Sequence, residues 1–108
     1  MFYKGIFALI MLLPSLSYAA NDYVGKVASI KADGGIILVV LKDGTGNSGC
    51  GNSNSFWLDP KLDFDKAILS LAITAKAAER EVYALGGGEC KSGWPHKNSH
   101  KLSVFSLR

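Results

Sequence analysis

The sequence predicts a mostly β domain with one helix, in the order β-β-β-α-β-β, closed as a five-stranded antiparallel barrel. Three observations support this fold class. Five short segments have the apolar, β-branched composition of strands, and one longer segment has the spacing of an amphipathic helix. The strands also follow one another without the alternating helices that parallel crossovers need, which favours antiparallel pairing.

Two strands and a glycine turn open the domain. Val24–Ala32 is the predicted first strand, and Asp33–Gly35 has the composition of a hairpin turn. Ile36–Leu41 is a continuous apolar run of the length expected for a strand that is buried on both faces. The stretch Lys42–Asn54 is rich in Gly, Asn and Ser and is predicted to be a loop, and Ser55–Leu58 is the third strand.

The segment Phe64–Ala78 is predicted to be the helix. An aspartate, Asp59 or Asp63, is expected to cap its N-terminus. Asp65 is placed largely away from the apolar face, which Ile73 would widen. The residues predicted to form that face recur at i, i+3, i+4, i+7, i+8 and i+11, and they are Phe64, Ala67, Ile68, Leu71, Ala72 and Ala75.

The last third of the chain carries the final two strands. Glu81–Leu85 is the predicted fourth strand, and Gly86–Gly88 is expected to end it as a turn. A polar loop, Cys90–His100, then precedes a fifth strand over Lys101–Leu107. Five strands with a helix between the third and the fourth match an OB-like barrel.

The N-terminus has the features of a secretory signal peptide, residues 1–19. It has one lysine, an apolar run over Gly5–Leu13, and the small residues Ser17 and Ala19 where a signal peptidase cuts. The run is too short to span a bilayer, so we expect an exported protein, periplasmic or secreted, with no membrane span after cleavage. Residues 20–108 then form one OB-like domain. Its charge is +2 without clusters (12 basic residues less Lys4, against 9 acidic), which argues against a nucleic-acid partner.

The two cysteines, Cys50 and Cys90, predict a disulfide, because an even number of cysteines in an exported chain is typical of disulfide pairing. The alternative is a zinc site, in which Cys90 would act with His96 and His100 and need a further ligand. The polar residues and proline around the histidines do not favour a helix that would align them. We therefore expect no metal and no cofactor, and histidines in a solvated loop.

Several positions together resemble a known family, the small exported OB-barrel proteins related to the B subunit of subtilase cytotoxin. The resemblance covers most of the domain as an order of elements. It implies a ring of identical subunits, a glycan ligand bound on the side of the barrel, and a separate catalytic subunit as partner. The positions that carry it are the leader, Gly25-Lys26-Val27, Cys50, Phe56-Trp57 before Pro60, the helix Phe64–Ala78 and Val82.

Candidate ligand-binding residues are two tryptophans, Trp57 and Trp94, and two loop amides, Asn52 and Asn54. Aromatic faces stack on sugar rings and bases in OB barrels, and amides bond to hydroxyl groups. The structural alternatives are core packing for Trp57 and a plain connection for the loop. No catalytic motif is present, so we expect a non-enzymatic module that binds carbohydrate or a host surface. The alternative is a small periplasmic protein that binds, inhibits or assists an envelope protein.

Overall fold

The computed structural model describes residues 21–92 and 98–108. The predicted signal peptide and Trp94 lie outside these ranges. The order of elements is the predicted one. The elements are β1 (Asp22–Asp33), β2 (Ile36–Gly46), β3 (Ser55–Leu58), α1 (Asp63–Ala78), β4 (Val82–Lys91) and β5 (Ser99–Leu107).

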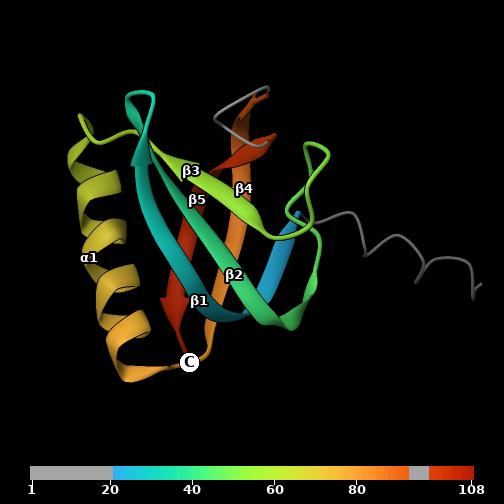
Figure 1. Cartoon of the computed structure of the whole chain (residues 1–108), viewed down its shortest axis with the longest axis vertical. Helices are drawn as coiled ribbons and strands as arrows, with labels where there is room; N and C mark the ends of the chain where they lie inside the picture. The colour runs from blue at the N-terminus through green and yellow to red at the C-terminus, as the bar shows by residue number, and fades with distance from the viewer. Residues whose placement is uncertain (1–20, 93–97) are drawn as a thin grey trace, which may run out of the picture.

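The five strands close into a barrel in the order β1-β2-β3-β5-β4, with β1 paired to both β2 and β4 (Figure 1). Four of the pairings are antiparallel. The fifth, between β3 and β5, is parallel and places Phe56 beside His100 and Trp57 beside Lys101. This confirms the five-stranded OB-like barrel.

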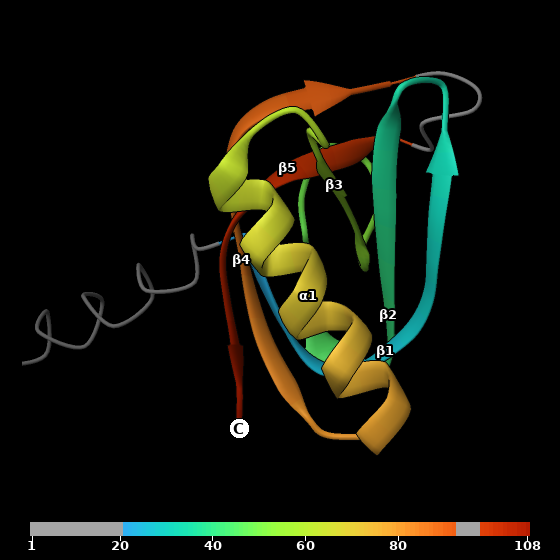
Figure 2. The same ribbon diagram turned by 90° about the vertical axis from the view of Figure 1, so that its left-hand side faces the viewer.

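The core lies inside the barrel and continues under α1. Inward side chains of the strands alternate with outward ones, as strand geometry requires. Figure 2 shows α1 in front of the barrel, with β4 and β5 to one side and β1 and β2 to the other. The hydrophobic residues of this core with no exposed surface are Val39, Leu41, Phe56, Ala72, Ala75, Val82, Ala84 and Leu102.

The second strand is longer than the sequence predicts, because it continues from Leu41 to Gly46 through residues predicted to be loop. Backbone pairing with β1 drives the extension, and Gly46 lies opposite Tyr23. The strands come so close that a Cβ on Gly44 would lie 1.7 Å from the Val24 carbonyl oxygen. Glycine is required there, so a residue that suggests a loop in the sequence instead allows two backbones to meet.

The fourth strand also continues where a turn was predicted. It runs through Gly86–Gly88 to Lys91, and its last residues pair with β5 after an irregularity between Gly86 and Cys90. A Cβ on Gly86 would lie 2.6 Å from the ring of His100, so the absence of a side chain makes room for the imidazole. The glycines therefore bend the strand without ending it.

The buried face of α1 differs from the predicted one. Its buried residues are Asp65, Ile68, Ala72 and Ala75, whereas Phe64 is 63% exposed and Leu71 is 41% exposed. Ala67 and Ile73 are exposed as well. The predicted face is thus wrong at one edge, because an aspartate near the first turn is buried where a hydrophobic side chain was expected.

The predicted aspartate caps are also wrong. The N-cap residue is Leu62, and no side chain caps the helix there. Asp59 instead accepts a hydrogen bond from the backbone N–H of Lys61, and Asp65 accepts one from the backbone N–H of Asp59. The two aspartates therefore order the chain before the helix.

Candidate functional site

The predicted disulfide is present. Cys50 and Cys90 are bonded with their Cα atoms 5.6 Å apart, and they join the turn before β3 to the end of β4. Because the Cys90 sulfur is oxidised, it offers no thiolate to zinc. Within residues 21–92 and 98–108, no three His, Cys, Asp or Glu side chains group closely enough to hold a metal ion. His96, the other proposed ligand, lies outside these ranges.

His100 is not the solvated loop residue that the sequence suggested. It belongs to β5 and is 7% exposed, with Nδ1 lying 2.7 Å from the carbonyl oxygen of Ser48. Since a carbonyl oxygen only accepts, Nδ1 carries the proton. The imidazole therefore holds the turn that contains Cys50 against the barrel.

Asn52 and Asn54 hold the loop before β3 in place. The Asn54 side-chain amide donates to the Leu41 carbonyl oxygen at 2.7 Å, and the Asn52 side-chain oxygen accepts from the Asn54 backbone N–H at 3.2 Å. Both side chains are half-buried. Contact between these amides and a ligand stays a prediction.

Trp57 lies in a small apolar cluster with Ile36 and Leu38, separate from the main core. Its side chain is covered, with 6% of the residue exposed, and its indole N–H donates to the Glu89 carbonyl oxygen at 3.0 Å. The ammonium group of Lys91 lies 4.9 Å from the ring centroid. Trp57 therefore packs β2 and β3 against the end of β4. The other candidate aromatic, Trp94, lies outside the described residues.

A buried ion pair between Asp65 and Lys101 was missed in the sequence. The Lys101 ammonium lies 2.7 Å and 2.9 Å from the two carboxylate oxygens of Asp65, whose side chain is 1% exposed. It also donates to the Leu102 carbonyl oxygen at 3.0 Å. The pair ties α1 to β5. One sequence signal exists, since Asp65 lies three residues before Ile68 and seven before Ala72, which places it on their face of the helix.

A second interaction missed in the sequence joins β4 to β1. The Tyr83 hydroxyl donates to the Asp22 carboxylate at 3.2 Å, and the guanidinium of Arg108 lies 5.7 Å from the Tyr83 ring centroid. Burial raises the pKa of the Tyr83 phenol from its ordinary value of 10.0. The hydrogen bond to Asp22 and the negative charge of that carboxylate raise the pKa further.

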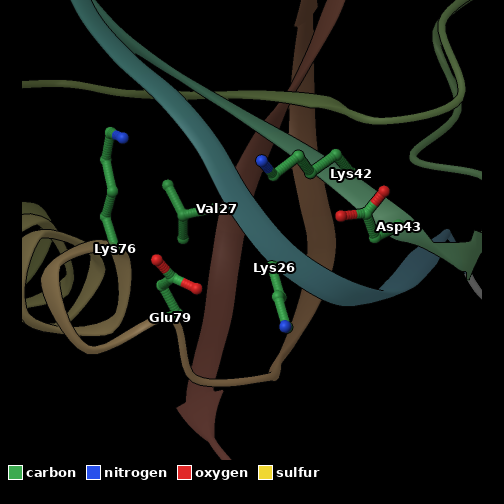
Figure 3. Close-up of a pocket in the computed structure, with 6 residues that line it drawn as sticks. All are labelled: Lys26, Val27, Lys42, Asp43, Lys76 and Glu79. Carbon is green, nitrogen blue, oxygen red and sulfur yellow. The ribbon is translucent and has the colours of Figure 1, made fainter.

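A small polar hollow lies between β1, β2 and the C-terminal end of α1 (Figure 3). Its volume is about 160 Å³, and none of the ligand-binding candidates from the sequence lines it. Figure 3 shows Val27 near its centre, Lys76 and Glu79 on the helix side, and Lys42 extending from the opposite side. The residues that line the polar hollow are Lys26, Val27, Lys42, Asp43, Lys76 and Glu79.

Irregular backbone shapes the walls of the polar hollow. The register of β1 against β2 shifts between Val24 and Lys26, as in a β-bulge, which bends a strand and redirects its side chains. Asp43 and Glu79 both have positive φ, 54° and 52°, a region that residues other than glycine rarely occupy. Glu79 is the C-cap of α1, and its backbone N–H bonds to carbonyl oxygens of the last turn. The surrounding fold therefore holds Asp43 and Glu79 in backbone conformations that such residues rarely adopt.

The charges at the polar hollow are not arranged as ion pairs. In the described ranges, ion pairs join Lys66 to Asp63, Lys91 to Glu89 and Lys101 to Asp65, and none of these residues lines the hollow. Three lysines and two acidic residues line the hollow, and Figure 3 shows the side chains of Lys26 and Lys76 extending in opposite directions. Such a site can donate hydrogen bonds to anions and hydroxyl groups and accept them from hydroxyl groups.

The helix also exposes apolar side chains beside its buried face. Leu62, Phe64, Leu71 and Ile73 are all exposed, and Val104 of β5 is exposed as well. An open apolar groove of about 420 Å³ follows the helix at Ile73. This groove lies beside the polar hollow, since Lys76 lines both.

Comparison of the chain with models of protein families, with curated proteins and with solved structures finds no match. None of the helices within residues 21–92 and 98–108 is long and apolar enough to cross a bilayer.

Proposed function

We propose that this chain is an exported, non-catalytic module that binds carbohydrate on a cell surface as part of a homo-oligomer, in the manner of the B subunit of subtilase cytotoxin. The observation that carries the proposal is the polar hollow. Sugar hydroxyl groups both donate and accept hydrogen bonds, and the hollow is lined by lysines, which can donate, and by acidic residues, which can accept. Val27 lines the hollow as well, but it is 5% exposed and belongs to the core, so the contacts proposed for a sugar are the polar ones.

The polar hollow is favoured over the indole of Trp57 as the sugar site because that ring is covered. The side chains that line the polar hollow come from two strands and the end of a helix. Sites on such elements hold their geometry better than sites on loops. Trp94, predicted to be exposed on the loop between β4 and β5, is kept as the alternative sugar contact.

A glycan screen with the oxidised protein, followed by calorimetry on the strongest hit, tests the proposal. Asp43→Asn and Glu79→Gln should each weaken binding about tenfold, because a hydrogen bond from a sugar hydroxyl to a charged acceptor contributes about 1.5–3 kcal/mol. Glu89→Gln is the matched control, since Glu89 is exposed and does not line the hollow. Absence of any glycan ligand would overturn the proposal. Binding lost only in Trp94→Ala would move the site to the loop.

Assembly is supported by exposed apolar side chains on α1 and at its N-cap. Exposed apolar surface can mark interaction sites on soluble proteins, and Phe64, Leu71 and Ile73 of the helix are exposed together with Leu62 at its N-cap. Native mass spectrometry should find a discrete closed ring at micromolar concentration, and Phe64→Glu should dissociate it. One face of such a ring would remain available to a separate catalytic subunit. A monomer at all concentrations would contradict the assembly.

The apolar groove at Ile73 favours a second candidate, a periplasmic protein that binds or assists an envelope protein. In this case, the groove at Ile30, Ile73 and Ala77 would receive a partner and not a second copy. Capture of one envelope protein by the monomeric wild-type chain, lost in Ile73→Glu, together with no glycan binding, would establish this alternative.

A further inference from the structure

We propose that the polar hollow binds a tetrahedral oxyanion, the phosphate or sulfate group of a sugar. This inference rests on the proposed function in one respect, namely that a carbohydrate carries the anion.

Lys26 and Lys42 lie directly opposite each other in the register of β1 and β2. Like charges at directly opposed positions of an antiparallel pair destabilise the sheet. Lys76, from the last turn of α1, adds a third ammonium to the same hollow. None of the three takes part in the ion pairs of the described ranges. A bound anion would relieve this repulsion, since it adds an opposite charge between the lysines.

The basic residues that line the hollow are all lysines. Arginine holds a planar carboxylate through two parallel hydrogen bonds, whereas lysine acts as a compact point charge with three rotatable donors. Three point charges from three elements suit an anion with oxygens in several directions, as in phosphate and sulfate. The two arginines of the sequence, Arg80 and Arg108, do not line the hollow, and Arg80 bonds to the Arg108 carbonyl oxygen.

The size of the hollow fits one such group. Pockets for drug-sized ligands have volumes of about 300–1,000 Å³. The polar hollow has about 160 Å³, so it would hold an anionic group and the nearest part of its carrier. The rest of a larger glycan would extend into solvent.

Asp43 and Glu79 add two carboxylates, which lower the net charge of the lining to one positive charge. Both carboxylates repel a free anion, so inorganic phosphate should bind more weakly here than it would to three lysines alone. A sugar hydroxyl beside the anion compensates by donating to a carboxylate. The lining should therefore prefer a sugar phosphate or sulfate to the free anion.

The experiment is calorimetric titration of the oxidised full domain at low ionic strength, because exposed charges are screened by salt. The probes are glucose 6-phosphate, glucose 6-sulfate, inorganic phosphate, inorganic sulfate, glucose and glucuronate. We expect one of the two substituted sugars to bind at least tenfold more tightly than the free anions, glucose or glucuronate. Lys42→Gln and Lys26→Gln should each weaken this binding about tenfold. Lys31→Gln, an exposed position on β1 outside the hollow, should leave it unchanged.

The outcomes separate this inference from the proposed function. Equal binding of sugar phosphate and inorganic phosphate would support the anion and overturn the sugar carrier. Glycan binding that depends on Asp43 and Glu79 but tolerates Lys42→Gln and Lys26→Gln would overturn the oxyanion and leave the proposed function standing. Preference for glucuronate would replace the tetrahedral anion with a carboxylate. Absence of binding by every probe and every glycan would overturn both.

Discussion

Replacing Lys101 with methionine would leave the carboxylate of Asp65 buried without its counter-charge. Methionine keeps most of the aliphatic length of lysine, so the packing changes little and the charge is the main loss. The Asp65 side chain is 1% exposed, and Lys101 contacts both of its oxygens at less than 3 Å. Its remaining hydrogen bond comes from the backbone N–H of Asp59. One neutral hydrogen-bond donor does not offset the free-energy cost of burying a charged carboxylate.

The expected loss is about 3–5 kcal/mol, the usual result of removing one partner from a buried ion pair. A domain of this length has a free energy of unfolding of about 4–13 kcal/mol, so the variant would be close to unfolding. Adding Asp65→Leu should restore part of the loss, because the buried charge is then absent. The double variant still leaves the Asp59 N–H without its acceptor, which costs about 1–3 kcal/mol.

Urea unfolding of the oxidised protein at neutral pH, extrapolated linearly to water, measures these free energies. Lys66→Met is the matched control, because Lys66 lies 3.8 Å from Asp63 in an exposed pair on the same helix. That variant should change stability by less than about 1 kcal/mol. Equal losses for Lys101→Met and Lys66→Met, or a double variant less stable than Lys101→Met, would contradict a stabilising role of Lys101 as the counter-charge of Asp65.

Three further predictions concern covalent closure, the helix face and alkaline pH. Replacing Cys50 and Cys90 with serine should cost about 4 kcal/mol, the loop-entropy value for a sequence separation of 40, in urea unfolding. Ile68→Asp should abolish cooperative melting because Ile68 is buried, whereas Leu71→Asp should cost about 1 kcal/mol or less; the opposite order would restore the predicted face. Burial and a hydrogen-bonded carboxylate raise the pKa of the Tyr83 phenol, so above about pH 10 the unfolded chain loses this proton first and stability falls. Tyr83→Phe should remove that part of the alkaline decline, and an unchanged pH profile would contradict it.

The helix shows how much of a buried face the spacing of apolar residues can predict. Ile68, Ala72 and Ala75 belong both to the predicted face and to the buried one. The two faces differ at an edge, where hydrophobicity favours Phe64 and the structure buries Asp65. Only the position of Lys101 on β5 makes the second choice favourable, and no local pattern contains that information.

In β2 and β4, the sequence predicts strand ends that the structure does not have. Glycines after Leu41 and Leu85 suggest the ends of strands, yet β2 and β4 both continue past them. Pairing with distant residues outweighs the local cost of glycine in a strand, and close backbone approach requires glycine at Gly44. The polar hollow has the same origin, since its lysines come from separate elements.

Composition and periodicity by themselves determined the number, type and order of the elements, and the pairing of Cys50 with Cys90. These properties depend on local conformational preference, on the alternation of apolar residues and on a single possible pair of thiols. The buried face of α1, the ends of β2 and β4, and the set of residues that lines the polar hollow follow from the three-dimensional arrangement of the elements. Those outcomes depend on contacts between residues far apart in the chain, and the free energy of these contacts exceeds the local preferences that a sequence displays.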